Sequence, residues 1–280
     1  MNYVRELRLE DLIREALKED IGRRDITTEF LIPIDKTVKA VILAKENCVI
    51  CGIDVAKLVF NTLDKKIKFK SGLRDGTAVK KGKIIASLSG KARSILSAER
   101  TALNFLGFLS GIATKTKKFT EAVKPYPVKI LDTRKTIPGW RLLQKYAVRT
   151  GGAFNHRLCL EEMVMVKDNH LKVMKGMRPI NGIEKKYKLE IEVKNLGELK
   201  EAMKFNPDII MFDNMDIKQM RRAVLFARKM QAKGKKTLLE ASGGISLNNI
   251  RKFASTGVDL ISVGTLTHSV DSADISLEII

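Results

Sequence analysis

Six short apolar runs, separated by segments of helical pattern, fill the sequence after Lys124 and Pro125 and constrain the fold more than any other feature. They cover residues 128–132, 163–167, 189–193, 208–212, 237–241 and 259–263. Strands that alternate with helices at spacings of about twenty to thirty-five residues form a parallel sheet with right-handed crossovers. A complete eight-fold barrel needs about 250 residues, and this part of the chain has roughly 160, so we predict an incomplete α/β (TIM-like) barrel.

The residues before this part follow a different pattern. We predict helices over 5–19, 54–63 and 91–123, and β structure over 38–53. Asp54 lies near the predicted N-cap of the second helix. A turn at Lys81 and Gly82 between short apolar strands predicts a plain hairpin. Gly107 and Gly111 in the long helix indicate close packing or a kink.

Polar or glycine residues stand at the end of each of the six apolar runs. In chain order these are Asp132, Thr133, Arg134 and Lys135; Lys167 and Asp168; Glu190 and Glu192; Asp213 and Asn214; Glu240, Ser242, Gly243 and Gly244; and Gly264, Thr265 and His268. The carboxyl ends of parallel strands meet at one edge of a sheet, and ligands bind there. We therefore predict that these residues form the rim of a ligand site.

Basic side chains are concentrated between residues 130 and 170, which indicates a site for a polyanion. They are Arg134, Lys135, Arg141, His156, Arg157, Lys167 and His170. Guanidinium and ammonium groups bind carboxylates and pyrophosphate through charge-assisted hydrogen bonds. We expect all three histidines, His156, His170 and His268, to lie in loop segments, and we predict that His156 contacts the substrate.

Acidic and glycine residues divide the rest of the rim. Glu192 and Asp213 offer oxygen ligands for Mg²⁺ or acceptors for sugar hydroxyls, and a structural ion pair is the alternative for either acid. The turns at 241–246 and 262–267 contain glycine, and each precedes an expected helix start. Exposed backbone N–H groups at such turns bind phosphate, which predicts a monophosphate site.

The composition limits the class of protein. A net charge of +20 fits nucleic acid, a small polyanionic substrate or a lysine-rich surface without a partner. The lysines are scattered, only 6% of residues are aromatic and no nucleic-acid motif is present, so we expect no nucleic-acid partner. No apolar run is long enough for a membrane span, and the charged first residues lack a signal peptide. We predict a cytoplasmic protein in which Cys48 and Cys51 are buried thiols.

Several of these motifs together resemble the quinolinate phosphoribosyltransferase family. They are LDTRKTIPGWRLLQKYAVRTGG, NHR, KDNH, IEVK, FDNM, EASGGI, GVDLISVGTLTHS and SAERTALNFL. The resemblance implies an N-terminal open α/β sandwich over residues 1–112, completed by 270–280, and a catalytic barrel over 113–269. It also implies a homodimer at least, and a hexamer built as a trimer of dimers as a further option.

The same resemblance implies the roles of individual residues. Lys135, Lys167, Glu192 and Asp213 would be catalytic, with Mg²⁺ as a mainly substrate-bound cofactor that the two acids would also ligate. Quinolinate would contact Thr133, Arg134, Lys135, His156, Arg157 and Lys167, together with Arg100 contributed to the neighbouring subunit's site. The 5-phosphate would contact Ser242, Gly243, Gly244, Val263, Gly264 and Thr265.

The implied reaction transfers phosphoribosyl from phosphoribosyl pyrophosphate to quinolinate with decarboxylation, as in NAD biosynthesis. Three alternatives remain open. A paralogous phosphoribosyltransferase of the same fold would act on another base. A barrel aldolase or synthase would use Lys135 or Lys167 as a Schiff-base lysine. A nucleic-acid-binding protein would explain the charge but not the strand ends. Trp140, Thr150, Ala153 and Cys159 depart from the family's pattern, which affects the expected shape of the loops.

Overall fold

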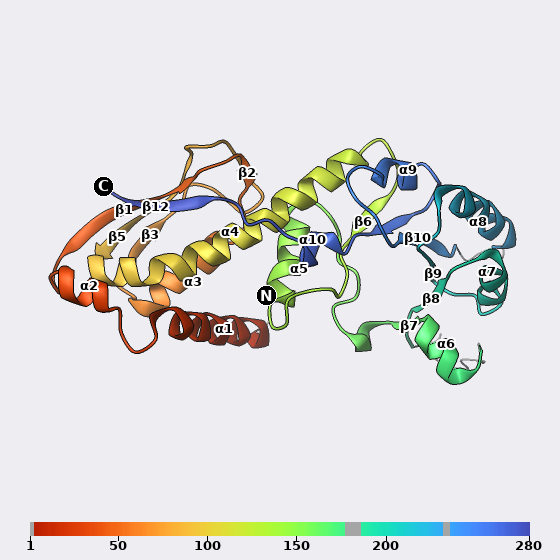
Figure 1. The fold of residues 1–280 in the computed structure, drawn as a ribbon, viewed down its shortest axis with the longest axis horizontal. Helices are drawn as coiled ribbons and strands as arrows, with labels where there is room; N and C mark the ends of the chain where they lie inside the picture. The colour runs from red at the N-terminus through yellow and green to blue at the C-terminus, as the bar shows by residue number, and fades with distance from the viewer. Residues whose placement is uncertain (1–2, 177–185, 232–235) are drawn as a thin grey trace. The chain divides into compact units, whose positions relative to one another are not determined.

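The computed structural model describes residues 3–176, 186–231 and 236–280. The chain divides into two compact units, one made of Met1–Lys115 with Val270–Ile280 and the other of Thr116–Ser269. Figure 1 labels the helices and strands in chain order. Within the described residues, no helix has the length and apolar character needed to cross a membrane.

The first unit is built on a four-stranded antiparallel sheet in the order β12-β1-β5-β3. Its strands are β1 (Thr37–Ala44), β3 (Lys68–Lys70), β5 (Ile84–Lys91) and β12 (Ile275–Ile279), and its helices are α1 (Tyr3–Ile21), α2 (Ile26–Leu31), α3 (Ile53–Leu63) and α4 (Ala92–Ala122). The three predicted helices are confirmed as α1, α3 and α4. The last strand of the chain completes the sheet, since Ile42 of β1 pairs with Leu277 of β12.

One of two local predictions for this unit needs correction. β4 (Ala78–Val79) and β5 flank the turn at Gly82, but β4 pairs with β2 (Cys48–Val49) and β5 pairs with β1 and β3. The expected plain hairpin is therefore wrong, because the turn joins strands of two different sheets. At α3 the N-cap is Gly52, and the carboxylate of Asp75 accepts the N–H groups of Gly52 and Ile53. Asp54 lies in the first turn, near the N-cap as predicted.

The glycines of α4 allow a close approach of the backbone. A Cβ at Gly107 would lie 2.8 Å from the carbonyl oxygen of Ala273, and one at Gly111 would collide with the carbonyl oxygen of Asp271. The N–H of Ala273 donates to the carbonyl oxygen of Gly107 at 2.9 Å. Close packing, one of the two alternatives for these glycines, is confirmed, and it fixes the segment that leads into β12.

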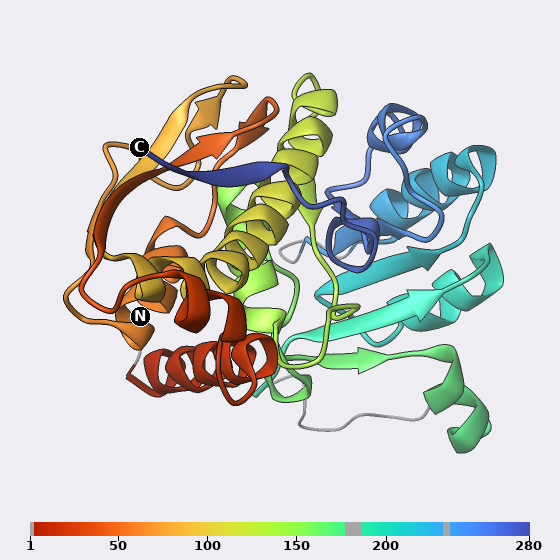
Figure 2. The same cartoon turned by 60° about the vertical axis from the view of Figure 1, so that its left-hand side comes forward.

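The second unit carries a six-stranded sheet in the order β6-β11-β10-β9-β8-β7, and all its pairs are parallel (Figure 2). Its strands are β6 (Lys129–Leu131), β7 (Val164–Val166), β8 (Leu189–Val193), β9 (Ile209–Asp213), β10 (Leu238–Ser242) and β11 (Leu260–Ser262). Each lies within one or two residues of a predicted run. The incomplete α/β barrel is confirmed, and the carboxyl ends of its strands share one edge.

Helices and one 3-10 turn connect these strands. They are α5 (Arg141–Thr150), the 3-10 turn Leu160–Glu162, α6 (Asp168–Met174), α7 (Leu196–Met203), α8 (Ile217–Met230), α9 (Ile250–Ala254) and α10 (Thr265–His268). On α8 the buried residues Met220, Ala223, Val224 and Ala227 recur at spacings of three and four and form one apolar face. Strand β8 is buried at every position, as expected for a strand covered on both faces.

Candidate active site

The end of β6 supplies the first cations of the site. Thr133 and Arg134 are half-buried and Lys135 is exposed. The N–H of Lys135 donates to the hydroxyl of Thr133, and the hydroxyl of Thr267 donates to the carbonyl oxygen of Lys135. The Nε of Arg134 is buried and has no hydrogen-bond partner among the described residues. This segment therefore offers a guanidinium group that is available to an anion.

A buried ion pair holds the neighbouring loop, residues 154–159. Lys145 of α5 donates to Asp132 at 2.5 Å and to the carbonyl oxygen of His156 at 2.8 Å. Asp132 also accepts the N–H of His156 and the side-chain amide of Asn155. Asp132 has no exposed surface, so its predicted place on the rim is wrong. Its carboxylate supports the rim from beneath.

Burial acts on both members of this pair in opposite directions. It raises the pKa of Asp132, whereas the ammonium group of Lys145 lowers it, and the net shift is upward. Burial lowers the pKa of Lys145 despite the attraction of Asp132. Each shift disfavours the charged form, as expected for charges removed from water. The hydrogen bonds within and around the pair favour the charged forms and so oppose the effect of burial in part.

His156 and Arg157 occupy the same loop, and both are half-buried. The N–H of Arg157 donates to Nδ1 of His156 at 2.8 Å, and its guanidinium donates to the carbonyl oxygen of Met163 at 2.9 Å. Burial lowers the pKa of Arg157, and the charge of Arg134 lowers it further. The structure thus brings Arg134 and Arg157 close enough for their like charges to interact, which favours binding of an anion beside them.

The second side of the site is formed by strands β7, β8 and β9. The ammonium group of Lys167 lies 2.6 Å from Oε2 of Glu192, which is buried. Asp213 is half-buried and accepts the side-chain amide of Asn214. Lys194 was missing from the predicted site, although it follows directly on β8. Its hydrogen bond with Asp168 raises the pKa of the Lys194 ammonium group, and Asp213 and Glu192 raise it further.

Two strand-end acids lie inside the barrel. Glu190 and Glu240 have no exposed surface, so their expected place on the rim is wrong. Nε2 of His156 lies 3.1 Å from Oε2 of Glu190 and 3.7 Å from Oε2 of Glu240. The ligand atoms of these three side chains all lie within 4.8 Å of one another, close enough to hold a metal ion. Among the described residues, no other group of three or more His, Cys, Asp or Glu side chains meets this condition. Glu192 and Asp213 do not belong to it.

The glycine turns after β10 and β11 are neighbours, since these two strands pair with each other. Gly243 and Gly244 have φ of +97° and +59°, and a Cβ at Gly243 would collide with the side chain of Asn214. Within the described part of the chain, no acceptor is assigned to the N–H groups of Gly243, Gly244, Gly264 or Thr265. Ser242 is half-buried, and Val263 is buried. These free N–H groups suit an anion.

The other histidines and Arg141 have structural contacts. His170 lies in the first turn of α6, where its Nδ1 accepts the N–H of Lys167. His268 ends α10, with Nδ1 2.7 Å from the hydroxyl of Ser269. The expected loop position is therefore wrong for both, and right for His156. Arg141 donates to Thr136 and to the carbonyl oxygen of Leu158, so it fixes loops.

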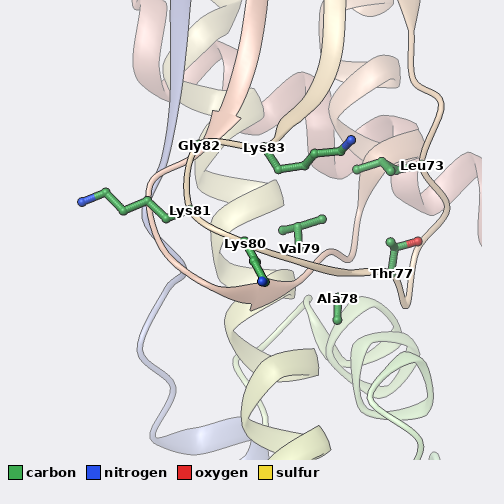
Figure 3. A pocket seen from close by; sticks show the side chains of 8 residues that line it. All are labelled: Leu73, Thr77, Ala78, Val79, Lys80, Lys81, Gly82 and Lys83. Atoms are coloured by element: carbon green, nitrogen blue, oxygen red, sulfur yellow. The ribbon is translucent and has the colours of Figure 1, made fainter.

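Arg100 lies apart from these residues in the sequence, on α4. It is exposed, as its position off the apolar stripe predicts. A hollow of about 420 Å³ also lies in the first unit, around the turn at Gly82 (Figure 3). Lys80, Lys81 and Lys83 point in different directions there, and none of the predicted site residues lines it. Cys48 and Cys51 are buried thiols, as predicted, and burial raises the pKa of Cys48 to about 11.

A parallel barrel sheet with converging cations, two acids and adjacent glycine turns defines an enzyme site for anionic substrates that include a phosphate. Comparisons with known proteins agree with this class. Residues 25–110 match the family model described as quinolinate phosphoribosyl transferase, N-terminal domain, and residues 112–278 match the model of its C-terminal domain. The chain belongs to the quinolinate phosphoribosyl transferase family.

Individual relatives cover nearly the whole chain. A probable nicotinate-nucleotide pyrophosphorylase (carboxylating) of Methanocaldococcus jannaschii is 41% identical over 276 residues, with 96% of each chain covered. The nicotinate-nucleotide pyrophosphorylase (carboxylating) of Mycobacterium leprae is 39% identical over 278 residues, again with 96% of each covered. The solved structure of the nicotinate-nucleotide pyrophosphorylase from Francisella tularensis is 42% identical with a TM-score of 0.89, covering 98% of this chain and 96% of that one.

Proposed function

We propose that this chain transfers the phosphoribosyl group of phosphoribosyl pyrophosphate to quinolinate and releases pyrophosphate and CO₂, giving nicotinate mononucleotide for NAD biosynthesis. The observation that carries the proposal is the pair of neighbouring guanidinium groups, Arg134 and Arg157, on the same sheet edge as the Lys167–Glu192 contact. A diacid needs several fixed cations, whereas a neutral base needs none. Membership of the family supports the same reaction.

Quinolinate would bind where β6, the loop after α5 and β7 end. Thr133, Arg134, Lys135, His156, Arg157 and Lys167 would line this part of the site, with Arg100 donated by the neighbouring subunit of a homodimer or a hexamer. Arg134 and Arg157 repel each other until a carboxylate lies between them. Binding of the diacid would place its ring nitrogen against the anomeric carbon of the sugar.

Phosphoribosyl pyrophosphate would bind across the remaining strand ends. The free N–H groups of Gly243, Gly244, Gly264 and Thr265 would donate hydrogen bonds to the 5-phosphate, with Ser242 and Val263 beside them. Glu192 and Asp213 would accept the ribose hydroxyls and stabilise positive charge on the sugar. The Lys135 side chain passes over Gly264: a Cβ added to Gly264 would lie 3.4 Å from Cδ of Lys135. The ammonium group of Lys135 would then lie next to the bound 5-phosphate.

Mg²⁺ would reach the site on the pyrophosphate of the substrate. Glu192 pairs with Lys167 and Asp213 accepts the side-chain amide of Asn214, and both acids would help to hold the Mg²⁺ that the pyrophosphate brings. When bound, Mg²⁺ would compensate the negative charge of the leaving pyrophosphate. Lys135 and Lys167 would stabilise the same charge from the protein.

Decarboxylation would follow transfer of the sugar. The C1–O bond to pyrophosphate breaks while the bond between C1 and the ring nitrogen forms, which leaves that nitrogen cationic. A cationic nitrogen stabilises the carbanion that remains on the adjacent carbon when CO₂ leaves, and a proton then adds to that carbon. CO₂ should therefore not appear without phosphoribosyl pyrophosphate.

The test is an assay with quinolinate, phosphoribosyl pyrophosphate and Mg²⁺ that follows pyrophosphate and CO₂ together, with nicotinate as a parallel substrate. We expect equal release of both products from quinolinate and little turnover of nicotinate. Pyrophosphate release with another base alone would favour the paralogous phosphoribosyltransferase. Covalent trapping of a sugar phosphate on Lys135 or Lys167 by borohydride would favour an aldolase.

We also propose that the enzyme works in the cytoplasm. All three cysteines are thiols that form no disulfide, and Cys48 and Cys51 are buried, which is typical of proteins in a reducing compartment. The protein partners implied by this function are copies of the same chain, and neither nucleic acid nor a membrane is required.

A further inference from the structure

Two acidic side chains that the proposed reaction does not explain, Glu190 and Glu240, meet His156 inside the barrel of the second unit. Glu190 on β8 and Glu240 on β10 are fully buried, and β9 lies between their strands. Nε2 of His156 lies close to a carboxylate oxygen of each. Neither contact has hydrogen-bond alignment, and the four carboxylate oxygens have no other hydrogen-bond partner among the described residues. Such groups are rare in a protein interior and usually serve a purpose.

A bound metal ion is not the best explanation for this group. Nδ1 of His156 accepts the N–H of Arg157, and a ring nitrogen that accepts a hydrogen bond carries no proton. The proton of the neutral ring is therefore on Nε2, which faces the two carboxylates. A metal at Nε2 would require the proton on Nδ1, where it would face the N–H of Arg157. The arrangement suits an imidazole N–H held between two acids.

Nδ1 of His156 is thus hydrogen-bonded within the protein, and Nε2 faces the two acids. On the other side of the loop, the backbone of His156 is held by Asp132 and Lys145. The ring connects this loop to the barrel interior, and through Nδ1 it holds the backbone of Arg157. The direction of the Arg157 guanidinium, which approaches Arg134, depends on that backbone.

We propose that Glu190 and Glu240 are positioning residues for quinolinate: they hold the ring of His156 and thereby set the place of Arg157. The inference rests on the proposed function, because Arg157 is there a cation for the diacid. Neither acid touches the substrate in this account. Burial and the charge of Glu190 raise the pKa of Glu240 to about 8, so one proton is available to relieve the repulsion between the two carboxylates.

The test compares substitutions that remove or keep a hydrogen-bond acceptor at the same size. In Glu190→Met and Glu240→Met the acceptor is lost, and we expect KM for quinolinate to rise about tenfold, a loss of binding rather than of chemistry. KM for phosphoribosyl pyrophosphate and kcat should stay within about twofold. Glu190→Gln and Glu240→Gln keep an amide oxygen near Nε2 and should restore most of the affinity.

A matched control is Met211→Leu on β9. Met211 is buried in the same barrel and lies in register with Glu192 on one side and Glu240 on the other, but it has no polar atom for His156. Both KM values should remain near those of the wild type. This control separates repacking of the barrel interior from loss of the two acids.

Several outcomes would overturn the inference. They are an unchanged KM for quinolinate in the Met variants, an equal rise for both substrates, or no recovery with Gln. If the Met variants do not fold, Glu190→Asp tests the inference instead, because it moves the carboxylate away from Nε2 of His156 by one methylene group. A selective rise in KM for quinolinate supports the inference and no change refutes it. Failure of the proposed function is distinct, because the wild type itself would then not convert quinolinate.

Discussion

Lys145 and Asp132 are the residues whose loss should affect the stability of the second unit most. Their side chains are 4% and 0% exposed. Removing one member of a buried ion pair leaves an uncompensated charge, so Lys145→Met should lower the free energy of unfolding by about 3–5 kcal/mol. Urea denaturation measures this change.

The double variant Asp132→Asn with Lys145→Met is the control for this prediction. It removes both charges, and it should recover part of the stability that the single variant loses. If the free energy of unfolding of Lys145→Met lies within about 1 kcal/mol of the wild-type value, the ion pair does not stabilise the loop of residues 154–159.

Glu240 should make stability fall as pH rises. Its pKa is raised from 4.5 to about 8 in the folded state, chiefly by burial and then by Glu190, while His156, Ser262 and Lys167 oppose the shift. The folded chain therefore keeps a proton that the unfolded chain loses above about pH 4.5. Stability should decrease between about pH 4.5 and 8 by at most about 1.4 kcal/mol per pH unit.

The variant Glu240→Gln cannot lose this proton, so its stability relative to the wild type should increase with pH across that range. Urea midpoints of both proteins at several pH values give the difference directly, because the other titrating groups largely cancel. A difference that stays constant with pH would mean that Glu240 ionises as an exposed carboxyl does.

The residues of the rim could be predicted because they follow apolar runs, and this pattern is visible in the sequence itself. The supports beneath the rim could not. Lys145 reads as one more helix lysine, and it becomes a partner of Asp132 only when α5 returns to β6. Glu190 and Glu192 lie on the same face of β8, and only the position of each along the strand decides that Glu190 is fully buried while Glu192 reaches Lys167.

At the scale of elements, the turn after β10 should depend on glycine at one position more than at the next. Gly243 has positive φ and no room for a Cβ beside Asn214, whereas Gly244 has positive φ but nothing within 4 Å. Gly243→Ala should therefore raise KM for phosphoribosyl pyrophosphate about tenfold or more, since the N–H groups for the phosphate would move.

Gly244→Ala is the matched variant, with the strain of positive φ but without the collision. It should change the same KM by only a few-fold, with KM for quinolinate unaffected in both variants. Equal effects of the two substitutions would mean that backbone conformation alone, and not the approach of Asn214, sets the turn.

The same scale shows where sequence patterns stop being informative. The six parallel strands were predictable because each crossover is local and of one hand. The partner of β5 was not, since the turn at Gly82 is visible in the sequence while the pairing with β1 is a contact between distant residues. Asp75 likewise caps α3 from more than twenty residues away.

At the scale of the whole molecule, Arg100 tests whether the active site is shared between subunits. It is exposed on α4, where its charge acts on the neighbouring Glu99, and its side chain has no hydrogen bond or ion pair within the described residues. If it binds a carboxylate of quinolinate, Arg100→Ala should lower kcat/KM for quinolinate about ten- to a hundredfold. Arg93 on the same helix is the control, because its guanidinium is bound to the carbonyl oxygens of Ile32 and Glu29. Arg93→Ala should affect stability and leave KM for quinolinate unchanged.

Mixing of inactive variants then decides whose site Arg100 serves. Arg100→Ala and Lys135→Ala subunits, unfolded and refolded together, should form about half mixed dimers. If each site takes Arg100 from its neighbour, one site of every mixed dimer has both residues, and about a quarter of the wild-type activity returns. If Arg100 serves its own subunit, every site lacks one residue and no activity returns. A mixture of Arg100→Ala with the double variant gives the background, because none of its dimers can contain an intact site under either arrangement.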